Sequence, residues 1–218
     1  MSRCIIVLAT GRSGSSAVSG MLHHIGVHMT DKEHTAGFNH RNHPGGHWED
    51  LRWHRLGLDI MDAGFPYQPT VAQVMQYEKL ASEREEHPLW GVKTPTFSLI
   101  LKPLLQGDIF PDATKVVAVH RSLVSCALSR VDKDRPRMTY DEAVAEQVKR
   151  SRSMLGIIQY CNGRKIPVHH ISYERLLKEP LKHAAELSQF IRIGWTDIGM
   201  ASDISAAAHF IRPDYARY

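Results

Sequence analysis

The residues with the most evident chemistry lie near the amino terminus, where a glycine- and serine-rich loop follows an apolar run. Residues 3–9 read Arg-Cys-Ile-Ile-Val-Leu-Ala, which predicts a buried strand, and residues 10–16 read Thr-Gly-Arg-Ser-Gly-Ser-Ser. Glycines let the backbone N–H groups of such a loop turn inward, and a following helix directs its positive end at the same point. The sequence therefore predicts a phosphate cradle, formed by Gly11, Arg12, Ser13, Gly14, Ser15 and Ser16.

This loop departs from the one that binds nucleoside triphosphates. A Walker loop ends in Gly-Lys-Ser or Gly-Lys-Thr, whereas Gly14 is followed here by Ser15, and the basic residue Arg12 precedes the second glycine. The strand and its short loop resemble the 5′-phosphosulfate loop of sulfotransferases that use 3′-phosphoadenosine 5′-phosphosulfate (PAPS). The alternative reading is a glycine-containing turn between a strand and a helix that binds no ligand.

A second segment fits the same resemblance. Residues 114–120 read Thr-Lys-Val-Val-Ala-Val-His, which predicts another buried strand; Arg121 follows it, and Ser129 comes eight positions later in a stretch that favours a helix. A guanidinium at the end of the strand and a hydroxyl two turns along the helix could both reach one phosphate. The spacing matches the 3′-phosphate motif of sulfotransferases, so the resemblance implies that Arg121 and Ser129 bind the 3′-phosphate of PAPS.

Three further segments resemble parts of the same family. Residues 90–97, Trp-Gly-Val-Lys-Thr-Pro-Thr-Phe, resemble a stretch of glycan sulfotransferases in which a lysine, here Lys93, follows a short strand at the edge of the active site. Residues 171–176 resemble a late strand followed by Tyr-Glu in many members, and residues 42–50 resemble an element of bacterial sulfotransferase-like proteins. The resemblance extends from residue 3 to about residue 180.

The resemblance implies transfer of a sulfuryl group from PAPS to a hydroxyl or amine, with release of adenosine 3′,5′-bisphosphate. Arg12 and the loop amides would neutralise the leaving 5′-phosphate, and Lys93 would contact the bridging oxygen. A base must also take the proton of the acceptor; Glu49 and His47 are the candidates, and we favour Glu49. Either could instead be structural, Glu49 as a charge in the first turn of a helix and His47 as a loop residue.

The acceptor cannot be named from the sequence beyond a small molecule, a glycan or a peptide. We expect its pocket to be built from the loop near residues 30–48, the turn at 62–70 and the carboxyl-terminal tail at 210–215. Two other functions stay open. A small-molecule kinase using ATP is disfavoured because the loop lacks Gly-Lys-Ser/Thr and the strand at 114–120 ends in His120, followed by Arg121, instead of Asp. A nucleotide-binding module without catalytic activity would keep the cradle and lack the base.

Histidines are concentrated in one part of the chain, with eight of the 14 between residues 23 and 54. No cysteine lies among them, and their spacings match no zinc pattern, so we predict no metal site. Sulfuryl transfer from PAPS requires no metal either. We interpret most of these histidines as residues of loops and helix surfaces.

Composition and charge narrow the classes of protein further. The 218 residues, 43% of them hydrophobic, can form one domain spanning residues 1–218, and the net charge of +4 favours an anionic ligand. Nucleic acid is not an expected partner, because the basic cluster at 149–152 is short and reads as a solvated helix face. No apolar stretch reaches the length of a membrane span, and Cys4, Cys126 and Cys161 read as reduced thiols, so we expect a cytoplasmic protein.

The order of predicted elements indicates the fold class. Strands are predicted at residues 3–9, 89–92, 114–120 and 166–171. Helices are predicted at residues 15–26, 49–62, 70–86, 96–105, 122–131, 139–161, 173–178, 180–191 and 196–208. Strands that alternate with helices predict an α/β protein of the P-loop type, with a parallel sheet, helices on both faces and ligands beyond the carboxyl ends of the strands.

Overall fold

The computed structural model describes residues 2–35, 47–134, 138–195 and 203–211. Its strands form one parallel sheet in the order β2-β1-β3-β4. Their bounds are β1 (Arg3–Ala9), β2 (Leu89–Lys93), β3 (Thr114–His120) and β4 (Val168–Ser172). The predicted α/β fold with a parallel sheet is confirmed, and β4 begins two residues later than the sequence pattern indicated.

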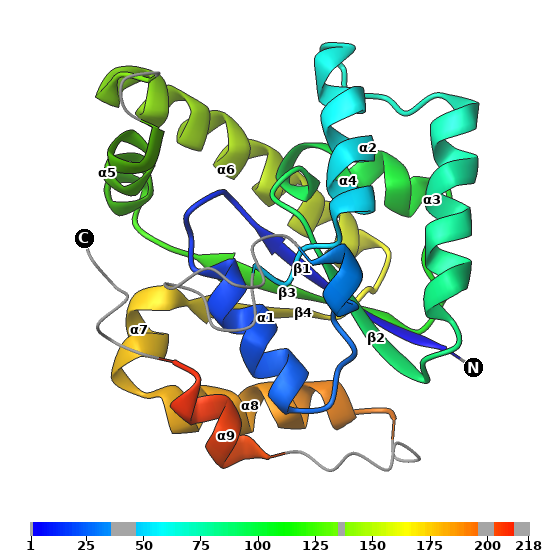
Figure 1. Ribbon diagram of the computed structural model, residues 1–218, viewed down its shortest axis with the longest axis vertical. Coiled ribbons are helices and arrows are strands. Elements are labelled where there is room, and N and C mark those ends of the chain that lie inside the picture. The colour runs from blue at the N-terminus through cyan, green and yellow to red at the C-terminus, as the bar shows by residue number, and fades with distance from the viewer. Residues whose placement is uncertain (1, 36–46, 135–137, 196–202, 212–218) are drawn as a thin grey trace.

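Helices cover both faces of this sheet (Figure 1). Their bounds are α1 (Ser15–His24), α2 (Leu51–Asp62), α3 (Val71–Arg84), α4 (Phe97–Gln106), α5 (Leu123–Asp134), α6 (Tyr140–Gly163), α7 (Tyr173–Lys178), α8 (Pro180–Arg192) and α9 (Ile204–His209). Part of the predicted helix at 196–208 lies outside the described residues; α9 accounts for the rest. Within the described ranges, no helix combines the length and apolar character needed to cross a bilayer.

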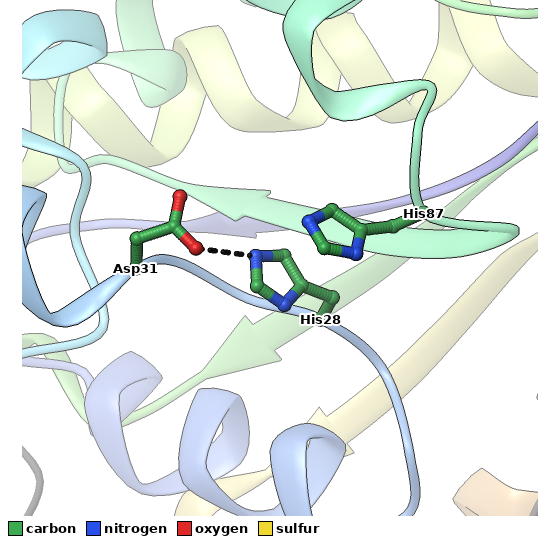
Figure 2. A group of neighbouring side chains, drawn as sticks. All are labelled: His28, Asp31 and His87. Carbon is green, nitrogen blue, oxygen red and sulfur yellow. Dashed lines mark ion pairs between the residues drawn. The ribbon is translucent and has the colours of Figure 1, made fainter.

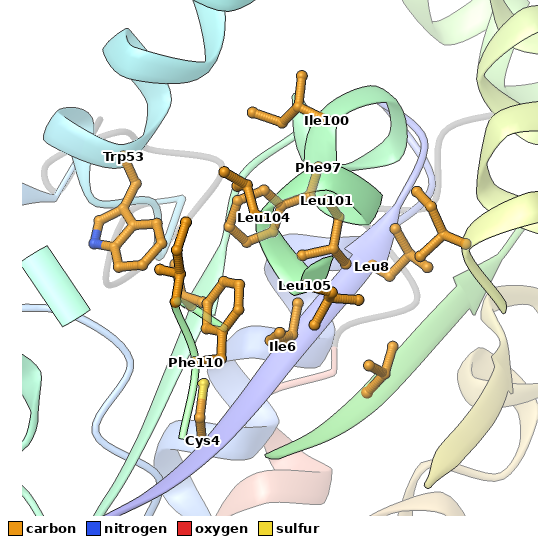
Figure 3. Packing of buried hydrophobic residues seen from close by; sticks show 14 of the residues in the cluster. Cys4, Ile6, Leu8, Trp53, Phe97, Ile100, Leu101, Leu104, Leu105 and Phe110 are labelled. Atoms are coloured by element: carbon orange, nitrogen blue, oxygen red, sulfur yellow. The ribbon is translucent and has the colours of Figure 1, made fainter. Parts of the chain in front are cut away.

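The side chains of β1 alternate between two hydrophobic cores. Cys4, Ile6 and Leu8 face one core, while Ile5 and Val7 face the other. Successive side chains on a strand point to opposite faces, so a strand buried on both sides reads as one continuous apolar run. The first core is filled from α2, α3, α4 and α6 (Figure 3), and the second from α1, α7, α8 and α9.

The topology brings three strand ends together. β1 lies between β2 and β3, and all three run in the same direction, so the segments that follow them meet at one edge of the sheet. These segments begin at Thr10, Thr94 and Arg121, and Lys93 is the last residue of β2. Ligands of such sheets bind at this edge, where successive crossovers leave the central strand in different directions.

The longest helix begins and ends where local signals place it. The hydroxyl of Thr139 accepts a hydrogen bond from the N–H of Glu142, and the Glu142 carboxylate accepts one from the N–H of Thr139. This reciprocal pair is the capping box that the sequence predicts. α6 then runs to Gly163, next to the predicted stop at Asn162-Gly163.

α2 begins at Leu51, because Asp50 caps it. The Asp50 carboxylate accepts a hydrogen bond from the N–H of Arg52 at 2.9 Å, and it also binds the guanidinium of the buried Arg84 at 2.7 Å. Glu49 therefore precedes the helix. The alternative reading of Glu49 as a charge in the first turn of a helix is wrong, since Asp50 takes the capping position.

Lys115 of β3 fastens the end of α8 to the sheet. Its ammonium donates to the carbonyl oxygens of Phe190, Ile191 and Ile193 at 2.8, 3.0 and 2.6 Å. The ammonium also lies 3.9 Å from the centre of the Trp195 ring. A lysine in this place satisfies carbonyls that the end of a helix leaves without partners.

Lys115→Met should lower the free energy of unfolding by about 1.5–3 kcal/mol, because the charge-assisted bonds are lost and three carbonyls are left without their donor. Urea unfolding of the variant measures the change. Lys182→Met is the control, since that lysine lies on α8 but is largely exposed. Equal stability of the two variants would contradict the assigned role of Lys115.

Candidate active site

The loop between β1 and α1 has the backbone shape of an anion cradle. Arg12 and Gly14 both adopt left-handed conformations, with φ of 69° and 87°. A Cβ at Gly14 would lie 2.2 Å from the Tyr173 ring, so glycine is needed there both for its conformation and for the close approach of the ring. α1 begins directly after the loop, and its first N–H groups lack partners within the helix. The hydroxyl of Ser13 donates to the carbonyl of Thr10 at 2.7 Å and so closes the loop on itself.

Arg12, Arg121 and Ser129 meet on one side of this loop. The Nε of Arg12 donates to the Ser129 hydroxyl at 3.0 Å, and Arg121 donates from Nη1 to the Arg12 carbonyl at 3.0 Å. The Arg121 guanidinium also lies over the Tyr173 ring, 5.1 Å from its centre. Residues 117 positions apart are thus joined, and the arginine–serine pair singled out by its spacing lies at the cradle.

Lys93, Ser16, His47 and Glu49 meet on the other side. Lys93 is 2% exposed, and its ammonium donates to the Ser16 hydroxyl at 3.1 Å and to the His47 carbonyl at 2.9 Å. It also forms an ion pair with the Glu49 carboxylate. The contact through His47 is made by its backbone. The sequence proposed Lys93, Glu49 and His47 for catalysis together with Arg12 of the loop itself, and the structure places all of them at or beside the loop.

The charges at this point favour an ionised carboxylate. Burial raises the pKa of Glu49, but the charge of Lys93 and its hydrogen bond outweigh burial, so the pKa lies below the ordinary value of 4.5. The imidazoles of His54 and His47 add smaller effects in the same direction. Glu49 is thus negative at neutral pH and able to accept a proton.

His54 of α2 is a neighbour of this group that the sequence patterns did not single out. Its Nδ1 lies 3.0 Å from the Thr94 hydroxyl, which in turn lies 3.0 Å from the hydroxyl of Thr96. Burial lowers the pKa of His54, while the charge of Glu49 acts in the opposite direction. The imidazole is therefore mainly neutral at pH 7. His54 belongs to no recognisable motif, so neither its residue type nor its position four residues after Asp50 pointed to the site.

Gln147 and Arg130 support the other end of the loop, and no sequence signal marked either of them. Gln147 is fully buried and donates from Nε2 to the Gly11 carbonyl at 3.1 Å, while its Oε1 has no hydrogen-bond partner among the described residues. A Cβ at Gly11 would lie 3.4 Å from Nη1 of Arg130, which brings another cation close to the cradle. A buried acceptor and a cation beside a phosphate loop suit a polar ligand.

The basic cluster at 149–152 is not a uniformly solvated face, as the sequence had suggested. Arg150 is 6% exposed, pairs with Glu146, and donates to the Pro95 carbonyl at 2.9 Å. It lies one turn after the buried Gln147, so the helical period places both on the inner side of α6. Arg150 thereby holds α6 against the segment that follows Lys93.

A cavity of about 650 Å³ lies between the α2–α3 connection, α4 and α6. Its wall is largely apolar and includes Phe65, Pro66 and Tyr67, the turn expected to contribute to an acceptor pocket. Lys102, Lys149 and Arg152 add three cations to the wall. Two other segments were expected to line that pocket, the loop near 30–48 and the tail at 210–215. Residues 36–46 and 212–215 of these segments lie outside the described residues.

Solved sulfotransferases share this fold. The sulfotransferase domain of the olefin synthase of Synechococcus PCC 7002 has a TM-score of 0.53 and 19% identity, over 88% of this chain and 73% of that domain. STF9 from Mycobacterium avium has a TM-score of 0.56 and 14% identity, over 95% of this chain and 67% of STF9. The sulfotransferase domain from the curacin biosynthetic pathway has a TM-score of 0.54 and 14% identity, over 99% and 89% of the two chains. At such identities the likeness concerns the fold alone.

The sequence itself provides the family. Comparison with curated proteins finds no match. The sequence pattern of the sulfotransferase family, in contrast, matches residues 4–197, a range that contains the cradle, Lys93 and the pair of Arg121 and Ser129. Because this match extends over far more than half of the chain, the protein belongs to the sulfotransferase family.

Proposed function

We propose that this sulfotransferase uses PAPS as its donor and transfers the sulfuryl group to a hydroxyl or amine. The observation that carries the proposal is the position of Lys93, whose ammonium contacts both Ser16 of the cradle and the Glu49 carboxylate. A cation that can stabilise a leaving phosphate thus lies next to a base that can take the acceptor proton. Group transfer needs these two functions side by side.

The groups at the cradle fit the charges of PAPS. When bound, PAPS supplies an activated sulfuryl group on its 5′-phosphate. The backbone amides of Ser13–Ser16 and the hydroxyls of Ser15 and Ser16 would hold the 5′-phosphosulfate at the start of α1. Arg121 and Ser129 would hold the 3′-phosphate, since a guanidinium and a hydroxyl are well suited to phosphate oxygens.

The roles of the side chains follow from the bonds that change. Sulfuryl transfer breaks the bond between sulfur and the bridging oxygen, and it forms one between sulfur and the acceptor oxygen or nitrogen. Arg12 and Lys93 would stabilise the negative charge that develops on the phosphate as the bond breaks. Glu49 would accept the proton that leaves the acceptor, as an ionised carboxylate can at neutral pH.

We also propose where the acceptor binds and where the protein works. The cavity beside Tyr67 is the candidate for the apolar part of a small-molecule, glycan or peptide acceptor, and its three cations suit one with negative charge. A cytoplasmic location is supported by Cys4, Cys126 and Cys161, which are all buried free thiols.

The affinity for adenosine 3′,5′-bisphosphate over AMP tests the choice of donor. If Arg121 binds the 3′-phosphate, the bisphosphate should bind far more tightly, and Arg121→Ala should remove most of this preference. Loss of one charge-assisted contact costs about 1.5–3 kcal/mol, or roughly ten- to a hundredfold in affinity. Isothermal titration calorimetry with both nucleotides measures the ratio.

The exposed Arg55 of α2 provides the matched control, since Arg55→Ala should leave the preference unchanged. An Arg121→Ala protein with the wild-type preference would refute the assignment. Two further outcomes would replace the proposed reaction. Magnesium-dependent turnover of ATP would indicate a kinase, and tight bisphosphate binding with no transfer from labelled PAPS to any acceptor would indicate a binding module.

A further inference from the structure

Three metal-ligating side chains meet at the end of β2 that lies away from the active site (Figure 2). His28 and Asp31 come from the segment after α1, and His87 comes from the turn between α3 and β2. Each side chain offers one ligand atom, and these atoms all lie within 4.8 Å of one another. Nε2 of His28 and Oδ1 of Asp31 are 3.1 Å apart, and the imidazoles of His28 and His87 are stacked with their centres 3.5 Å apart.

Backbone hydrogen bonds fix the position of His28 beside β2. The N–H of His28 donates to the Leu89 carbonyl at 3.0 Å, and the His28 carbonyl accepts from the N–H of Gly91 at 2.8 Å. His28 is thereby fixed beside the start of β2, while His87 lies two residues before that strand. Lys93 ends the same strand at the active site, so the cluster and the transfer chemistry occupy opposite ends of β2.

The donor set suits a divalent transition metal. Two imidazoles and a carboxylate are ligands of zinc and of related ions, and the partial exposure of all three leaves room for water. Zinc binds such atoms at about 2.0–2.2 Å, which places neighbouring ligand atoms roughly 3–3.6 Å apart. The separation of His28 and Asp31 already falls in this range. The two imidazoles would need to turn out of their stacked arrangement to direct both lone pairs at one ion.

The local charges permit a cation. The carboxylate of Asp31 lies beside the His28 imidazole and offers a negative charge to a cation. Nε2 of His28 is buried and faces Oδ1 of Asp31. The nearby positive charge of Arg84 is neutralised by Asp50, at 2.7 Å.

We propose that His28, Asp31 and His87 bind one divalent transition-metal ion, of which Zn²⁺ is the representative. The ion would join the segment after α1 to the turn before β2 and so stabilise this edge of the sheet. The proposal is independent of the transfer reaction, because none of the three residues belongs to the cradle or contacts Lys93. Sequence spacing missed the site because His87 lies outside the histidine-rich part of the chain.

Metal titration of the full chain, first stripped with a chelator, tests the site. Calorimetry with Zn²⁺ and visible absorption with Co²⁺ should each show one saturable site per chain. His87→Gln and Asp31→Asn should each weaken binding at least about tenfold, since loss of a ligand costs no less than loss of an outer-shell partner. Zn²⁺ should also raise the unfolding temperature of the wild type more than that of either variant.

His34→Gln is the matched control, because His34 follows Asp31 by one helical turn and takes no part in the cluster. It should bind Zn²⁺ like the wild type. Absence of a saturable site in the wild type would overturn the proposal, as would equal weakening by His34→Gln and His87→Gln. If His87→Gln does not fold, Asp31→Asn alone decides the question, because the side chain of Asp31 is partly exposed and its substitution should not disturb the core.

Discussion

Glu49→Gln is expected to lower the rate of sulfuryl transfer by about 10²–10⁴-fold, the usual contribution of a general base. The amide has nearly the same shape as the carboxylate and can still accept a hydrogen bond from Lys93, so nucleotide affinity should change little. Turnover with labelled PAPS and calorimetry with adenosine 3′,5′-bisphosphate measure the two quantities. His47→Ala should cost much less, because His47 contacts Lys93 through its backbone carbonyl, which alanine keeps.

The pH profile distinguishes the two candidate bases. The pKa of Glu49 lies below its ordinary value of 4.5, so its carboxylate stays ionised as the pH falls, until the pH reaches that lowered pKa. A Glu49 base therefore keeps kcat constant well below pH 6, whereas a histidine base with an ordinary pKa places the acidic limb of the profile at about pH 6.5. An active Glu49→Gln enzyme with a limb near neutrality would transfer the role to a histidine such as His47. Loss of nucleotide affinity in Glu49→Gln would instead identify Glu49 as a residue that orders the cradle through Lys93.

Arg12→Ala is expected to reduce kcat by about 10²–10³-fold, the effect of removing one donor that stabilises developing charge. Charge on the leaving phosphate grows as the sulfur–oxygen bond breaks, so the loss should be larger in turnover than in donor affinity. Initial rates over a range of PAPS concentrations separate kcat from KM. A higher KM with unchanged kcat would show that Arg12 only holds the donor.

Two companion variants separate the charge of Arg12 from its structural contacts. Ser129→Ala removes the hydroxyl that orients the guanidinium at 3.0 Å and keeps the charge, so its loss of kcat should be smaller. Arg12→Lys keeps the charge without the planar guanidinium and should recover part of the activity lost in Arg12→Ala. Equal losses in all three variants would mean that the contact between Arg12 and Ser129, not the charge, is what matters.

Much of the fold could be predicted from local sequence signals. The apolar runs at 4–9 and 116–119 lie in strands that are buried on both faces, and such strands read as uninterrupted apolar sequence. Thr139 and Glu142 mark the start of α6 because a capping box involves only residues within one turn. The cradle is equally local, since its two glycines and the start of α1 all lie between Gly11 and Ser15.

The tertiary structure alone decided which distant groups meet. The parallel pairing places the carboxyl ends of β1, β2 and β3 at one edge of the sheet, and the order β2-β1-β3 makes them neighbours. Gln147 contacts Gly11 across 136 positions, and nothing in the residues around it announces that contact. Arg150 belongs to a run of charges that the sequence suggested was solvated, but in the structure it lies on the inner side of α6, one turn after Gln147.

The same distinction separates the two sites. The residues of the cradle could be proposed from the sequence because each lies at the end of an apolar run or at a known spacing from one. His28 and His87 carry no such signal; they are neighbours because the segment after α1 pairs with the first residues of β2. Glu49 is intermediate. The sequence marked it as a candidate base but placed it inside a predicted helix at 49–62, whereas the structure places it before α2, and its ionisation depends on the buried ammonium of Lys93. Sequence patterns report on neighbours along the chain, whereas charge and coordination depend on neighbours in space.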